Sequence, residues 1–162
     1  MAELDQWAGS PTLLQQLEVT GFEGAGAGSY STAFVDYLLS NRVSFELHNL
    51  QFEELGLELA EEDLSAIRTG LFADPAATAA VFDELGDGYE EELVADVARQ
   101  VAVSDAMGED YPAWQAEAFT RTDIEINPRF GSWDSQVGQV AAPLGPRRAP
   151  GSEALVEPGP GG

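Results

Sequence analysis

Side chains able to carry out chemistry are few in this sequence. It has a single histidine, His48, and no cysteine, so a thiolate zinc site and a cysteine nucleophile are excluded. A catalytic triad or a metal-bound water would require His48 to meet a nucleophile or further ligands. No motif supplies them. We therefore interpret His48 as a partly exposed residue of a helix and not as a catalytic group.

Two other segments resemble ligand-binding motifs but lack essential parts. Glycine alternates with alanine over residues 24–28, without the spacing or the preceding strand of a dinucleotide-binding loop. Residues 83–94 match an EF-hand calcium loop at three positions, but Leu85 and Val94 stand where two of the ligands should be. The sequence predicts no catalytic residue, no metal site and no cofactor.

The charge composition of the chain limits the binding partners that we expect. Acidic residues outnumber basic ones by 29 to 7 in a chain of 162 residues, and the formal net charge is −22. Nucleic-acid binding needs a basic face, and anionic membrane surfaces repel an acidic protein, so we expect neither partner. The same charge favours basic polypeptides. No apolar run approaches the roughly 18 residues that a membrane-spanning helix requires.

Helical periodicity dominates residues 1–140. Ser10-Pro11 and Asp74-Pro75 each combine an N-cap with a proline at the first helical position, and so predict the starts of two helices. Apolar residues at steps of three and four predict a long helix over about residues 31–55, ended by Gly56. Further helices are expected over residues 59–71, 89–107 and 112–120.

The end of the chain differs in character. Ile124 and Ile126 alternate with polar residues over residues 123–127, which predicts a short strand ended by Pro128. Residues 141–162 are rich in proline and glycine, and we expect them to form a disordered tail. The predicted fold class is therefore mainly α, with one domain over residues 1–140.

Two segments resemble a known family. Glu54-Leu55-Gly56-Leu57, followed by Glu61-Glu62-Asp63, is similar to the turn between the first two core helices in the N-terminal chaperone domain of SurA-type foldases. Asn127-Pro128-Arg129-Phe130-Gly131-Ser132-Trp133 resembles the closing segment of SurA-like lipoproteins from high-GC Gram-positive bacteria. The family usually has threonine or serine where this chain has Ala60, so the second helix is expected to lack its N-cap.

The resemblance implies a helical bundle with one long central helix and a short C-terminal strand that returns to the core. The returning segment would form a clasp in which two isoleucines face the core, an arginine meets a carboxylate and two aromatic rings act as anchors. Its residues are Ile124, Ile126, Pro128, Arg129, Phe130 and Trp133.

The resemblance also implies a function and a location. It implies a non-catalytic, ATP-independent chaperone that binds unfolded or partly folded exported polypeptides outside the cytoplasm or in the cell envelope. Met1 to Trp7 show no signal peptide, so the chain would be cytoplasmic if its start is genuine. The aromatic residues expected to bind clients are Phe52, Tyr111, Trp114, Phe119 and Phe130.

Two alternatives stay open. The helices could form a structural module that docks one specific protein. The chain could instead be a remnant of a prolyl isomerase, because many relatives carry a parvulin domain. Met107 and Tyr111 leave no room for that domain, and the single His48 does not supply paired histidines. We therefore expect no enzymatic activity.

Overall fold

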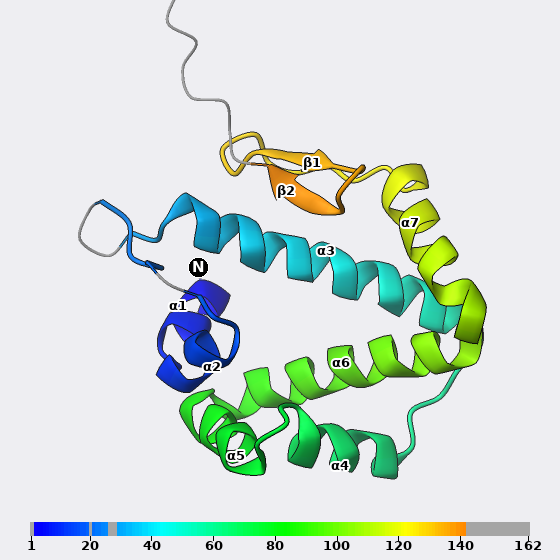
Figure 1. Ribbon diagram of the computed structural model, residues 1–162, viewed down its shortest axis with the longest axis horizontal. Coiled ribbons are helices and arrows are strands. Elements are labelled where there is room, and N and C mark those ends of the chain that lie inside the picture. The colour runs from blue at the N-terminus through cyan, green and yellow to red at the C-terminus, as the bar shows by residue number, and fades with distance from the viewer. Residues whose placement is uncertain (1, 20, 26–28, 142–162) are drawn as a thin grey trace, which may run out of the picture.

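The computed structural model describes residues 2–19, 21–25 and 29–141 and confirms a mainly helical fold. Figure 1 shows the C-terminal hairpin, α3, α6 and α4 in that order from top to bottom, with α7 at one end and α1, α2 and α5 at the other. The elements are α1 (Ala2–Ala8), α2 (Pro11–Gln16), α3 (Thr32–Glu54), α4 (Glu61–Gly70), α5 (Pro75–Glu84), α6 (Asp87–Met107), the 3-10 turn η1 (Gly108–Asp110), α7 (Tyr111–Arg121), β1 (Ser132–Asp134) and β2 (Gln139–Ala141).

Local sequence explains where the helices begin. The side chains of Ser10, Ser31 and Asp74 each accept a backbone N–H at the first turn of α2, α3 and α5. Ala60 cannot cap α4 in this way, as expected. There the carboxylate of Asp63 instead accepts the backbone N–H of Ala60 at 2.8 Å, which replaces part of the missing cap.

The main buried core lies where α1, α2 and α5 meet the first halves of α3 and α6. Its side chains are Trp7, Leu13, Leu14, Phe34, Leu38, Val81, Leu85 and Leu93. Beyond this core α3 and α6 pack along each other, and α4 packs on α5 and α6. The sequence predicts one long central helix. The structure has two long helices at its centre, α3 and α6, which pack against each other.

The strand predicted over residues 123–127 is wrong. The described strands come later and form an antiparallel hairpin in which Trp133 lies opposite Val140. Residues 123–127 keep the alternation of the sequence, with Ile124 and Ile126 half-buried and their neighbours exposed, but no ladder joins them to a described residue.

One residue of the predicted tail, Ala141, belongs to the hairpin. Ala141 is the last residue of β2 and pairs with Ser132, because its backbone continues the ladder of Val140. The rest of the predicted tail, residues 142–162, lies outside the described residues.

The hairpin returns to the helices, but its contacts differ from the predicted clasp. Val140 is buried, and its backbone N–H donates to the Ser40 hydroxyl on α3 at 2.8 Å. Trp133 packs edge-on against Phe119 of α7, and its indole N–H donates to the Phe119 carbonyl at 3.1 Å. One predicted anchor, Trp133, thus holds the hairpin, while Val140 is an anchor that the sequence analysis missed.

The predicted contacts of Phe130, Arg129 and Pro128 are wrong. Phe130 is 41% exposed and lies in the turn before β1. Arg129 forms no ion pair with any described residue; only its backbone N–H is bonded, to the Asn127 side chain at 3.1 Å. Pro128 is exposed in the same turn and ends no paired strand.

These contacts predict different costs for two aromatic substitutions. Trp133→Ala removes a half-buried ring and an indole hydrogen bond, and should lower the free energy of unfolding by about 1–3 kcal/mol. Phe130→Ala is the matched control and should change it by less than about 0.5 kcal/mol. Urea denaturation measures both. An equal loss of unfolding free energy in the two variants would show that Trp133 does not anchor the hairpin.

Candidate functional site

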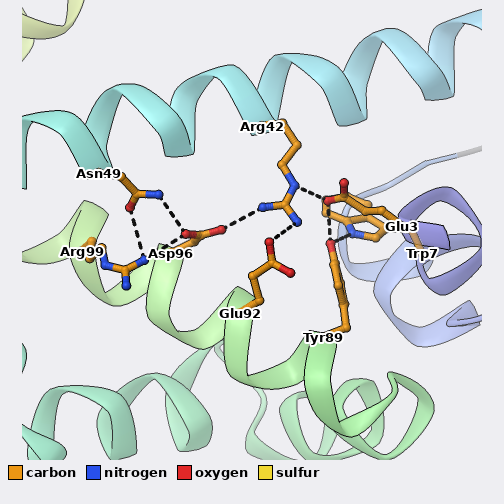
Figure 2. A network of polar contacts seen from close by, with 8 residues as sticks. All are labelled: Glu3, Trp7, Arg42, Asn49, Tyr89, Glu92, Asp96 and Arg99. Carbon is orange, nitrogen blue, oxygen red and sulfur yellow. Dashed lines mark hydrogen bonds and ion pairs between the residues drawn. The ribbon is translucent and has the colours of Figure 1, made fainter. Parts of the chain in front are cut away.

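The largest polar cluster joins α1, α3 and α6 around Arg42 (Figure 2). The Arg42 guanidinium binds Glu3 of α1 at 2.5 Å, and Glu92 and Asp96 of α6 at 2.9 and 3.0 Å. Desolvation lowers the pKa of Arg42, but Glu3 and Glu92 outweigh it and raise that pKa. Arg42 is therefore held charged between three carboxylates.

Most polar groups of the cluster are bonded within it. Asp96 is 4% exposed and its second carboxylate oxygen accepts from Asn49 at 3.2 Å and from Arg99 at 3.3 Å. The Tyr89 hydroxyl donates to Glu3 at 2.9 Å and accepts from the Trp7 indole. Burial raises the pKa of Tyr89, so its hydroxyl stays protonated. These residues cross-link helices, and we do not place the functional site there.

Replacing Arg42 should be far more costly than replacing a surface arginine. Arg42→Met leaves Asp96 buried with only Arg99 as a counter-charge, and should cost about 3–5 kcal/mol of unfolding free energy. Arg68→Met is the control, because Arg68 meets Glu61 and Glu90 only at 3.6 and 3.7 Å near the surface. Its loss should stay below about 1 kcal/mol in urea denaturation. Similar losses would contradict the cross-linking role of Arg42.

The interpretation of His48 as a partly exposed residue is wrong. It is 0% exposed, and Tyr111 and Trp114 of α7 pack against its ring. Nδ1 lies 2.6 Å from the Ser44 carbonyl and Nε2 lies 2.8 Å from the Tyr111 hydroxyl. A carbonyl can only accept, so Nδ1 carries the proton and the Tyr111 hydroxyl donates to Nε2.

His48 joins α3 to α7, with one ring nitrogen bonded to Ser44 of α3 and the other to Tyr111 of α7. Both of its ring nitrogens are bonded, and its ring packs edge-on against Trp114 with centroids 5.1 Å apart. The Trp114 indole donates in turn to the Gln51 side chain at 2.7 Å. Burial lowers the pKa of His48, although its bond to Ser44 opposes the shift. The neutral ring is therefore the form that holds α7 in place.

The lowered pKa gives stability a defined dependence on pH. His48 contributes stability above its ordinary pKa of about 6.5, and this is lost as pH falls from there toward the lower pKa of the folded state. The unfolding free energy of the wild type should fall more than that of His48→Gln between about pH 7.5 and pH 5. Parallel pH curves for the two proteins would contradict the buried neutral ring.

An apolar groove runs along the second half of α3. Its floor and walls are Leu39, Val43, Leu47, Leu50 and Ile124, and it continues toward α7 past Trp114. Leu50, near the C-terminal end of α3, is 60% exposed. The groove is thus an apolar surface that no described residue covers, and it is the best candidate for a functional site.

Acidic residues rim this groove. Glu46 and Glu54 lie along it on α3, and Glu117 lies on α7 paired with Arg121. Arg42 also borders the groove, but its guanidinium is already bound by three carboxylates. The unmatched charge at the rim is therefore negative. An apolar surface with an acidic rim can bind a polypeptide segment that is apolar and basic.

The aromatic residues expected to bind clients are scattered. Trp114 borders the groove, whereas Tyr111 is held against His48 and Phe52 is buried. Phe119 lies against Trp133 under the hairpin, and Phe130 is exposed in the turn before β1. The aliphatic floor was missed because Leu47 and Leu50 belong to a stripe that the sequence analysis assigned to the core.

A second hollow lies between α3 and β2 and contains Asp36. One of its carboxylate oxygens is buried and has no hydrogen-bond partner among the described residues. Burial raises the pKa of Asp36. No basic residue lines this hollow, and the Ser40 hydroxyl on its wall accepts the backbone N–H of Val140.

Comparisons with known proteins identify no relative: the chain matches no protein-family model, no curated protein and no solved structure. Within the described part of the chain, no group of three or more acidic or histidine side chains is placed to hold a metal ion. No described helix is both long and apolar enough to cross a membrane.

Proposed function

We propose that the chain is a non-catalytic, ATP-independent, chaperone-like domain that binds apolar segments of unfolded or partly folded polypeptides. The observation that carries the proposal is the apolar groove with Leu50 exposed at its centre. Covering a leucine of this kind contributes about 1–2 kcal/mol, which suits weak and reversible binding.

The charge of the chain supports the same function. At −22 it repels copies of itself, which keeps an exposed apolar groove from causing self-association. Glu46 and Glu54 at the rim attract basic segments of a client. Such a surface binds many sequences, because it selects for apolar and basic character and not for one shape.

The family resemblance belongs to this proposal. On it, α3, Gly56 and α4 correspond to the helix-turn-helix of a SurA-like N-terminal domain that lacks the parvulin domain. Gly56 has φ 64°, the left-handed conformation that such a turn after a long helix needs. An extracytoplasmic or cell-envelope location, with exported polypeptides as clients, follows from the resemblance alone.

Suppression of client aggregation tests the proposal. The purified chain should slow the aggregation of a chemically unfolded, basic test protein on dilution, as measured by light scattering. Leu50→Asp places a charge in the groove and should abolish most of this effect. Val137→Asp is the control, since Val137 is 63% exposed on the hairpin, away from the groove. Equal protection by both variants would contradict binding in the groove.

One alternative is a structural or partner-docking module in which the same groove binds a single folded protein. The exposure of Leu50 supports a docking module as strongly as it supports a chaperone-like domain. The two differ in breadth, because a docking module would leave unrelated unfolded clients unprotected.

The second alternative is a peptidyl-prolyl isomerase remnant. His48 is its natural candidate residue, and both of its ring nitrogens are already bonded. A proline-peptide assay should show only the uncatalysed rate of isomerisation. Acceleration that His48→Gln removes would overturn the non-enzymatic proposal.

A further inference from the structure

Residues 123–126 have backbone groups without partners. They form no hydrogen bond with any described residue, although they join α7 to the hairpin. Asp123 and Glu125 are exposed and Ile124 and Ile126 are half-buried, so the segment lies at the surface with the alternation of a strand. Figure 1 shows this connection running from the end of α7 along the length of the hairpin.

One edge of β1 faces this segment. The sheet has two strands, so the edge of β1 that does not pair with β2 has no strand partner among the described residues. A hollow of about 940 Å³ lies between the two edges. Its walls are residues 120–128 on one side, apart from Arg121, and Gly131, Ser132, Trp133 and Ser135 on the other.

The hollow is continuous with the apolar groove. Thr122 and Ile124 line both, so a chain lying in the hollow would lie next to the groove that Leu50 lines. Asp123 and Glu125 add two exposed carboxylates to this wall, and no basic residue lines the hollow. Both edges thus lie beside apolar surface and negative charge.

We propose that this hollow binds an extended segment of an apolar and basic polypeptide, which adds a strand between β1 and residues 123–126. The inference rests on the proposed function and deepens it. Free peptide N–H and C=O groups are complementary to another peptide backbone, which pairs with them in the manner of an added sheet strand. Alternate side chains of the bound segment then lie against Ile124 and Ile126.

Backbone pairing gives a physical reason for broad specificity. Every polypeptide carries the same N–H and C=O groups, so a site that reads them accepts unrelated sequences. Residues 123–127 alternate in sequence like a strand, but they have no partner strand within the described chain. On this proposal the client supplies that partner. A folded protein presents few such free segments, whereas an unfolded one presents many.

N-methylated peptides test the pairing directly. The probe is a peptide of about seven residues in which valine alternates with lysine. Binding is followed by the change in tryptophan fluorescence, because Trp133 lines the hollow. In a strand, alternate amides point to opposite edges. Because the bound strand pairs on both sides, N-methylation of the valine amides in one peptide and of the lysine amides in another should each weaken binding, by about tenfold or more relative to the unmethylated peptide. If either methylated peptide binds as tightly as the unmethylated one, pairing between the two edges is wrong.

Proline substitutions in the protein test the same backbone hydrogen bonds. Glu125→Pro and Ile126→Pro each remove one backbone N–H, on opposite edges of the segment, and Glu125→Ala and Ile126→Ala are their controls. At least one proline variant should bind the unmethylated peptide about tenfold more weakly than its alanine control. Thermal unfolding at the control's temperature establishes that the fold is intact. Both proline variants binding like their controls would overturn the proposal.

Failure of this inference is distinct from failure of the proposed function. If the chain protects an unfolded client, and Leu50→Asp removes the protection while methylation leaves peptide binding unchanged, the groove binds through side chains and strand pairing is wrong. If the chain protects no client and binds no peptide, the proposed function itself is wrong.

Discussion

The fold depends on the binding of three carboxylates by one guanidinium. A chain with 29 acidic and 7 basic residues repels itself as it becomes compact. Arg42 offsets this where α1, α3 and α6 meet, because Glu3, Glu92 and Asp96 all bind it. The pairing fixes the register of α3 against α6, since any other register would leave Asp96 buried without its partner.

Once α3 and α6 are fixed, the position of α7 decides what the second half of α3 exposes. His48 is covered on α3 and accepts from Tyr111, the first residue of α7. Trp114 reaches back to Gln51, so α7 lies across the end of α3 and not along its whole length. Leu50 is left uncovered as a consequence, and the groove forms beside it.

The same placement leaves backbone groups unsatisfied. From the end of α7 the chain crosses to the hairpin, which is anchored on α3 by Val140 and on α7 by Trp133. These anchors hold β1 apart from residues 123–126, and the hollow between them remains open. An exposed apolar groove and an unpaired edge are both costly in a protein that only has to fold. Their occurrence side by side supports a surface for binding polypeptide.

The sequence by itself determined the helices, because caps, prolines and periodicity act within a few residues. Ser10, Ser31, Asp74 and Gly56 stand where the pattern predicts. It also determined the alternation of residues 123–127, but not whether a partner strand would lie beside them. Tertiary structure alone decided that His48 is buried, that Leu50 is exposed and that Phe130 is no anchor. These outcomes depend on which helix covers which face, and periodicity shows that a face is apolar without showing what covers it.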